Sequence, residues 1–199
     1  MDRQVNLPES GSGFSVPDSV RALGLSLIAP IDTQALSEDE VELWWQFNKT
    51  QEYMFSDFER GNRIGWIARF RDMRHLHLDI GGDGYALLIN AWCCDTPEIH
   101  FCIWNPLRPF SLTLQAAVEI LDFTFSRLQA TRITGFIPTN NKLSAKLATM
   151  LGFKFEGCIR KSFRFFDQSY DVTVHGLLKE EWKQRQERLS HAKQQHESN

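Results

Sequence analysis

The strongest constraint on the fold is a long amphipathic segment near the middle of this 199-residue chain. In LTLQAAVEILDFTFSRLQ (112–129), apolar side chains recur in steps of four, three, four and three residues. This spacing places them on one side of an α-helix, so the segment predicts a helix packed on a core. The apolar runs EIHFCIW (98–104) and RITGFIP (132–138) flank it and predict strands. The chain is therefore expected to form an α/β domain.

The rest of the sequence extends this alternation. Ser37 and Glu40 form a capping box that opens a helical region from residue 38 to about residue 60. A second helix is predicted from Asn141 to Leu151, with Gly152 in the position of a left-handed cap. Apolar runs bounded by turn residues predict further strands. One is residues 23–31. Residues 75–80 and 85–94 form an antiparallel meander with 98–104, and residues 155–166 and 170–178 are joined by a turn at 167–169.

Composition sets the domain organisation. Hydrophobic residues make up 42% of the chain and aromatic residues 12%, enough for the core of one domain. Residues 1–20, rich in Gly, Ser and Pro, are expected to form a flexible arm, residues 21–182 the domain, and residues 183–199 a polar tail. The arm and the tail are candidates for contacts in a homo-oligomer or a larger assembly.

Charge and hydropathy exclude several partners. A net charge of −3 gives no electrostatic reason to bind nucleic acid or an anionic membrane. Neither a secretory leader nor an apolar run of about 18 residues is found, so we expect a soluble protein of the cytoplasm.

The cysteine and histidine residues show no metal-ligand spacing. The four cysteines, without a CxxC pair, are expected to be free thiols, and Cys93 and Cys94 should point to opposite faces of a strand. His75 and His77 share a predicted strand face, but the pattern supplies no third ligand, so we expect no metal site.

One motif set resembles a known family. After the strand 132–138 come Asn141, Ser144, LGF at 151–153, EG at 156–157 and a closing strand with Asp171, followed by LLKEEW. This pattern is similar to the GNAT superfamily of acyl-CoA-dependent N-acetyltransferases, above all to the branch that acetylates the N-termini of ribosomal proteins. The texture of the chain is also similar to GNAT-like proteins of bacteriophages. The resemblance implies a mainly antiparallel central sheet flanked by helices, with one parallel pair around a coenzyme cleft.

The resemblance also implies a binding site for acetyl-CoA. The strand 98–104 would splay and hold the pantetheine arm, with Ile103 and Trp104 at its far end. Asn141 would face the arm and Ser144 would lie near the sulfur atom. Asn and Ser are equally ordinary residues at the start of a helix, so both could serve only as caps.

Candidates for acid–base chemistry lie on the same strand. Glu98 and His100 alternate onto one strand face, beside Cys102, and either could take the proton of an ammonium group. In many relatives a tyrosine one helical turn before GF acts as the general acid. This chain has Ala148 there, so that acid is missing.

The segment predicted to bind the pyrophosphate departs from the family pattern R/Q-x-x-G-x-G/A. Arg108 matches, but Ser111 and Thr113 replace the glycines, and Pro109 removes a backbone donor. A cradle altered in this way predicts weakened coenzyme binding. A simple helix entry, with Ser111 as N-cap and Phe110 packed on the core, is the other interpretation.

Two functions follow. The first is an N-acetyltransferase acting on a protein or small-molecule amine, with an acceptor cleft shaped by the helix around Trp44 and Trp45 and by the turn in FFDQSYD (165–171). The second is a catalytically inactive GNAT-fold structural or interaction protein, such as a bacteriophage virion component, which would place it in a host cytoplasm or a virion.

Overall fold

The computed structural model describes residues 27–49, 56, 61–103, 105 and 107–197. The predicted N-terminal arm and Trp104 lie outside these residues. Seven strands form one sheet in the order β1-β2-β3-β4-β5-β7-β6, and β4–β5 is its parallel pair. The predicted fold, mainly antiparallel with one parallel pair, is confirmed. The strands are β1 (Ala29–Pro30), β2 (Leu76–Asp79), β3 (Gly84–Ile89), β4 (Glu98–Ile103), β5 (Arg132–Pro138), β6 (Lys154–Phe165) and β7 (Gln168–Leu178).

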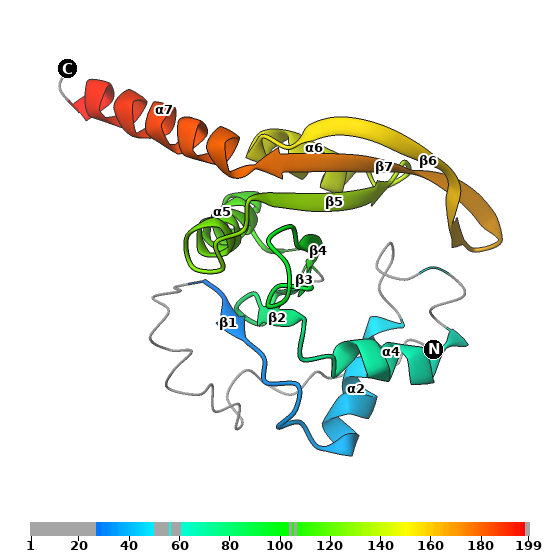
Figure 1. Ribbon diagram of the computed structural model, residues 1–199. Coiled ribbons are helices and arrows are strands. Elements are labelled where there is room, and N and C mark those ends of the chain that lie inside the picture. Colours follow the sequence, from blue (N-terminus) through cyan, green and yellow to red (C-terminus); the bar gives the residue numbers. More distant parts are fainter. Residues whose placement is uncertain (1–26, 50–55, 57–60, 104, 106, 198–199) are drawn as a thin grey trace.

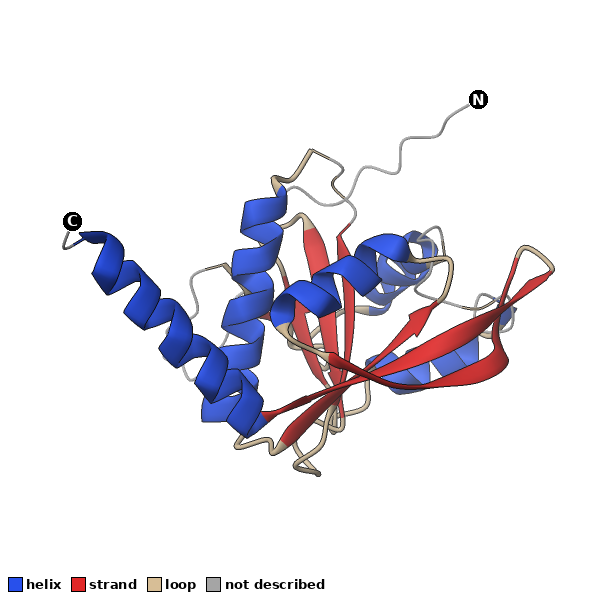
Figure 2. Cartoon of the chain, turned by 90° about the horizontal axis from the view of Figure 1, so that it is seen from above, coloured by secondary structure: helices blue, strands red, loops and turns tan. Residues whose placement is uncertain are grey.

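Helices cover both faces of this sheet (Figures 1 and 2). On one face α5 packs on alternate side chains of β2 and β3, among them Leu78 and Leu88. On the other face α2 and α4 form a separate cluster around Trp45 and Trp66. Period-two alternation in the strands divides the apolar side chains between these two layers. The helices are α2 (Glu38–Asn48), α4 (Arg63–Phe70), α5 (Phe110–Ser126), α6 (Lys142–Leu151) and α7 (Lys179–Glu197).

Several element boundaries differ from the sequence prediction: β1 comprises only Ala29–Pro30 of the predicted strand 23–31, and α2 ends at Asn48. Strand β3 ends at Ile89, because Asn90 turns the chain with a φ of 59°, so the predicted strand 85–94 is too long. Cys93 and Cys94 lie in the following turn and are both exposed, so their predicted placement on opposite faces of a strand is wrong. The β6–β7 turn comprises Phe166 and Asp167, both with positive φ, one residue earlier than predicted.

Helix α4 was not predicted. It has eight residues, and the Asn62 side chain caps it by accepting a hydrogen bond from Gly65 N at 2.9 Å. Its apolar side chains Trp66 and Phe70 are buried at a spacing of four. So short a segment shows little periodicity in the sequence, and its packing against α2 decides its conformation.

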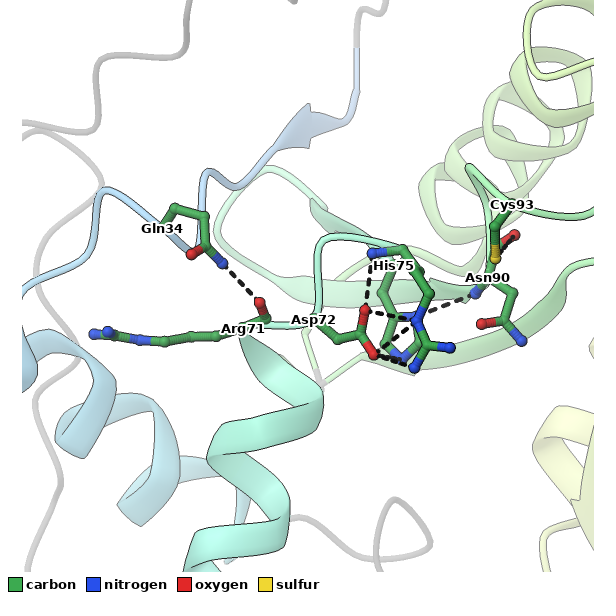
Figure 3. A network of polar contacts seen from close by, with 7 residues as sticks. Gln34, Arg71, Asp72, His75, Asn90 and Cys93 are labelled. Carbon is green, nitrogen blue, oxygen red and sulfur yellow. Dashed lines mark hydrogen bonds and ion pairs between the residues drawn. The ribbon is translucent and has the colours of Figure 1, made fainter.

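A polar network joins the end of α4 to the turn after β3 (Figure 3). The Asp72 carboxylate accepts hydrogen bonds from the Arg74 guanidinium, which holds the pKa of Asp72 well below its usual range. His75 Nδ1 accepts a hydrogen bond from Asn90 N at 3.1 Å, and burial lowers the pKa of His75. Gln34 adds a hydrogen bond to the Arg71 carbonyl at 2.7 Å. His75 is thus engaged in connecting two loops.

The β6–β7 hairpin extends well beyond the end of β5 (Figure 1). A register shift in β6 between Ile159 and Phe163 contains Lys161, which has a φ of 50°. Asp171 on β7 stabilises this irregularity, because its carboxylate accepts a hydrogen bond from Lys161 N at 2.8 Å. The acidic residue of the closing strand therefore has a structural contact.

Helix α7 continues to Glu197, within the predicted tail, and projects away from the sheet (Figure 1). Trp182 anchors it: its side chain is buried, and Nε1 donates a hydrogen bond to Asp122 on α5 at 2.7 Å. Arg185 donates to the Met150 carbonyl at 2.6 Å. Among the described helices, none combines the length and the apolar character that crossing a membrane requires.

A buried histidine–tyrosine pair lies between the sheet and α4. His77 Nδ1 is hydrogen-bonded to the Tyr85 hydroxyl, and the Phe70 ring packs edge-on against His77. Burial lowers the pKa of His77 to about 3 and raises the pKa of Tyr85. At neutral pH the pair is therefore an uncharged part of the core.

This pair predicts a loss of stability in mild acid. The folded pKa of His77 lies below the unfolded value of 6.5, so its contribution is complete above pH 6.5 and decreases as the pH falls toward 3. Between pH 6.5 and pH 5 we expect the free energy of unfolding to fall by about 2 kcal/mol through this group. Urea unfolding at both pH values measures the loss. A double variant, His77→Leu with Tyr85→Phe, should show a smaller loss, and an equal loss in both proteins would contradict the assignment.

Candidate functional site

Strands β4 and β5 separate after a single pair of residues. Glu98 is paired with Thr134, and Thr134 N donates a hydrogen bond to the Pro97 carbonyl at 3.1 Å. Beyond this pair the strands have no further register, and Figure 2 shows the strands fanning apart from one end of the sheet. A cavity of about 580 Å³ lies between them, closed on one side by α5 and α6.

Both strands and both helices contribute to the wall of this cavity. Six of the predicted site residues line it: His100, Ile103, Arg108, Thr113, Asn141 and Ser144. Glu98 and Ser111 are not among the lining residues. The structure therefore brings together, in one cleft, residues that lie up to 44 positions apart, because β4, α5, β5 and α6 follow one another around it.

The splay leaves main-chain polar groups of β4 facing the cleft. Backbone groups of a strand point alternately to its two neighbours, and the carbonyl of Pro97 points to β5. The groups of Phe101 and Ile103 have the same direction, but β5 pairs with β4 only at Thr134. Their N–H and C=O groups are thus available to a ligand, since buried main-chain groups need partners.

Asn141 is the N-cap of α6. Its Oδ1 accepts a hydrogen bond from Ser144 N at 3.1 Å, and Gly152 ends the helix with a φ of 94°. Both predicted ends of this helix are confirmed. Asn141 and Ser144 are half-buried and both line the cavity. The cap engages only the Oδ1 atom of Asn141, so capping and contact with a ligand are compatible.

The first turn of α5 lies at the wall of the cavity. The N-cap is Pro109, which makes no side-chain cap bond, so the predicted role of Ser111 as N-cap is wrong. Proline has no side-chain acceptor, and the first N–H groups of the helix are left for a ligand or solvent. Ser111 is exposed, whereas Thr113 is buried and lines the cavity. Ser111 and Thr113 stand where the family pattern has glycines, and of the two only Thr113 takes up space inside the cleft. Phe110 is 44% exposed, so its predicted packing on the core is wrong, and Lys146 Nζ lies 5.9 Å from the centre of its ring.

Arg108 is engaged within the protein. Its Nη1 lies 2.7 Å from Asp83 Oδ2, in the turn between β2 and β3, and only 5% of its side chain is exposed. The same nitrogen donates to the Ile80 carbonyl at 3.3 Å. The guanidinium therefore ties the segment before α5 to the sheet.

Glu98 and His100 are in direct contact. His100 Nε2 and Glu98 Oε1 form a hydrogen-bonded pair, which confirms that the two side chains share a strand face. Each side chain is 30% exposed. Their face is the one covered by α2 and α4, because Ile99 and Phe101 pack toward α5. Cys102 lies on the same face, and burial raises the pKa of its thiol to about 11, which makes it a poor nucleophile.

His175 is a cavity residue that the sequence prediction missed. It lies on β7 opposite Gly135 of β5, and both residues line the cavity. Thr173 donates to the Ile137 carbonyl, so its oxygen accepts from His175 Nε2 at 3.0 Å. Burial lowers the pKa of His175, which keeps the ring neutral. The alternation in YDVTVHGLL contained this signal, since it places His175 on the same face as the core residue Leu177.

Within the described residues, no group of three or more His, Cys, Asp or Glu side chains could hold a metal ion.

Comparison with protein families gives a match over most of the chain. The model of the acetyltransferase (GNAT) domain matches residues 17–154. A search of the curated proteins gave no match.

Several solved structures share the fold. A mutant of the spermidine N-acetyltransferase SpeG from Vibrio cholerae aligns with a TM-score of 0.62 at 16% identity, covering 81% of this chain and 99% of SpeG. A probable acetyltransferase aligns with a TM-score of 0.59 at 19% identity, covering 79% and 96%. A putative acetyltransferase aligns with a TM-score of 0.56 at 19% identity, covering 78% and 84%. At these identities the likeness shows a common fold.

The cap of α6 can be tested by substitution. We expect Asn141→Ala to lower the free energy of unfolding by about 1 kcal/mol, because Ser144 N loses its acceptor. Asn141→Ser retains a capping oxygen and should cost only a few tenths of a kcal/mol. Asn62→Ala, at the cap of α4, is the matched control with an equal expected cost. Urea unfolding measures all three, and an unchanged Asn141→Ala protein would show that the cap contributes nothing.

Proposed function

This chain belongs to the acetyltransferase (GNAT) domain family, and on that premise we propose that it is an acyl-CoA-dependent N-acetyltransferase for an amine of a protein or a small molecule. The observation that carries the proposal is the cleft between β4 and β5. Pairing between these strands stops after Glu98 and Thr134, and the cavity opens directly beyond them.

The residues of the cleft fit the pantetheine arm of acetyl-CoA. The arm carries amide groups, and the main-chain N–H and C=O groups of Phe101 and Ile103 face the cleft without a strand partner. Apolar walls from Ala117, Leu121 and Leu147 suit its methylene groups. Asn141 and Ser144 add polar groups at the α6 wall.

The phosphate end fits in a different way from the family pattern. Family members commonly use glycines to bring the main chain close to phosphate, and this chain has none at 111 and 113. The first turn of α5 still presents N–H groups that no side chain caps, at the positive end of a 17-residue helix. Exposed Ser111 does not obstruct them. We therefore assign the pyrophosphate to this helix end, with Thr113 narrowing the cleft.

Acetyl-CoA would supply the acetyl thioester, and the chain's own residues would handle the protons. An acceptor amine must be neutral to form the new N–C bond while the C–S bond breaks. The Glu98–His100 pair, half-exposed on the face of α2 and α4, is assigned to receive the ammonium proton. Ser144, at the α6 wall, is assigned to stabilise the departing sulfur. Ala148 supplies no acid, so water is the proton source that remains for the thiolate.

The partly exposed Glu98 carboxylate beside the cleft suits a cationic acceptor. SpeG, which shares the fold, is named a spermidine N-acetyltransferase, and spermidine is a polyamine. The negative charge of Glu98 would attract an ammonium group, whether it belongs to a polyamine or to a protein N-terminus. Both classes belong in the acceptor screen.

Binding of acetyl-CoA is the decisive test. We expect a micromolar dissociation constant by titration calorimetry, with desulfo-CoA binding as a reference without the sulfur. Gly135→Val should weaken binding at least tenfold, because its side chain would enter the cleft, where a Cβ at Gly135 meets only Ile99 Cγ2 at 4.0 Å. Gly157→Val, on β6 away from the cavity, is the control and should bind normally. An absence of binding at millimolar acetyl-CoA would sink the proposal and favour a structural or interaction protein with this fold.

The proton acceptor can be tested once a substrate amine is identified. Glu98→Gln and His100→Gln should each lower kcat roughly 10²-fold or more, because the pair would lose its basic group. The dissociation constant for acetyl-CoA should stay unchanged in Glu98→Gln, because Glu98 is not among the residues that line the cavity. Steady-state kinetics with a polyamine or peptide acceptor measures kcat. A variant with full kcat would remove that residue from the mechanism.

A further inference from the structure

We infer that Asp83, in the turn between β2 and β3, is a positioning residue for the phosphate end of the coenzyme site. It acts through Arg108 and Asn105, which hold the first turn of α5 at the cleft. The inference rests on the proposed binding of acyl-CoA. It assigns to Arg108 a role that differs from direct phosphate binding.

The Asp83 carboxylate uses both oxygens on the segment before α5. Its Oδ2 accepts a hydrogen bond from Arg108 Nη1 at 2.7 Å, and its Oδ1 accepts one from Asn105 Nδ2 at 2.6 Å. Its main-chain carbonyl also accepts from Asn105 N at 3.3 Å. Both partners line the cavity, so one side chain on a distant turn holds two cavity residues.

The contacts continue from these two residues into α5. Asn105 Oδ1 accepts a hydrogen bond from Leu107 N at 2.9 Å, and the Asn105 carbonyl accepts one from Arg108 N at 3.2 Å. Arg108 Nη2 donates to the Leu112 carbonyl, in the first turn of α5, at 3.5 Å. Asp83 is thus linked to the helix end by an unbroken series of hydrogen bonds.

Asp83, Asn105 and Arg108 form a clamp that is held rigid by burial, and the charges of Asp83 and Arg108 nearly cancel. Only 5% of the Arg108 side chain is exposed, and its Nε has no hydrogen-bond partner among the described residues. Asn105 and Arg108 lower the pKa of Asp83, so its carboxylate is ionised and compensates the guanidinium. Removing one partner would leave a buried charge without compensation.

The clamp offers a physical substitute for the missing glycines. Glycines let the main chain of a loop approach phosphate closely. A helix N-terminus without a side-chain cap binds phosphate through its own N–H groups, which must already point toward the ligand. Gly81 and Gly82, with φ of 58° and 74°, form the tight turn that brings Asp83 to Arg108. In this chain the glycines that support the proposed phosphate site therefore lie in the β2–β3 turn, and not in the segment 108–113 where the family pattern has them.

The test compares two ligands and two substitutions. The dissociation constant of coenzyme A is measured by calorimetry and that of pantetheine, which lacks the phosphates, by ligand-observed NMR. Asp83→Asn retains the shape and an acceptor for Asn105 but loses the charge paired with Arg108. We expect it to weaken coenzyme A at least tenfold, equal to about 1.4 kcal/mol, and Asp83→Ala to weaken it more. Pantetheine binding should not change.

Controls separate positioning from a general loss of structure. Glu42→Gln breaks the ion pair of Glu42 with Arg63, 2.7 Å long and remote from the cavity, and should leave both ligands unaffected. Thermal unfolding reports whether each variant is folded. If Asp83→Ala does not fold, the comparison rests on Asp83→Asn.

Three results would overturn the inference. Unchanged coenzyme A affinity in Asp83→Asn would show that the clamp has no bearing on phosphate. Equal loss of both ligands would indicate a purely structural residue. Tighter coenzyme A binding would show that Arg108, once released, is a direct phosphate ligand. Failure of the unaltered protein to bind coenzyme A would instead refute the proposed function, and this inference with it.

Discussion

The structure depends on one interrupted strand pairing. β4 is paired with β3 along all six of its residues and β5 with β7 along all seven, but β4 and β5 meet only at Glu98 and Thr134. Two well-paired half-sheets are therefore joined at one end and separated at the other. The separation leaves main-chain groups of β4 without the neighbouring strand that would normally pair with them, so a polar, extended ligand suits this cleft.

Helix α5 holds the two half-sheets in this arrangement. Ala116, Ile120 and Phe123 pack into the cluster with β2 and β3. Ala117, Leu121 and Phe125 pack into the cluster with β5, β7 and α7. One helix thus serves both cores with adjacent stripes of side chains, and its first turn is brought to the wall of the cleft. Helix α5, which has the strongest periodicity in the sequence, is thus also the element that joins the two half-sheets beside the cleft.

The two faces of the sheet carry different parts of the proposed site. Asn141, Ser144 and the start of α5 lie on the side of α5 and α6, where the coenzyme is proposed to bind. Glu98 and His100 point to the other face, which α2 and α4 cover and where we propose that the amine approaches. Because β4 and β5 diverge, reactants on the two sides can meet through the gap between them. A fully paired sheet would separate these groups.

The order of elements, the helix 142–151 with its caps, and the shared face of Glu98 and His100 could all be predicted from the sequence, because each follows from local periodicity, capping chemistry or strand alternation. Helix α4, the end of β3 at Asn90 and the N-cap of α5 could not, because packing and turn geometry override weak local signals there. The same holds for individual site residues. Arg108 matched a family motif, but its burial against Asp83, 25 residues earlier, depends on how the β2–β3 turn reaches the start of α5. His175 meets Gly135 only across paired strands. Local chain chemistry in the sequence alone determined most of the elements, α4 excepted, whereas only the tertiary structure decided which side chains face the cleft, since long-range pairing sets that.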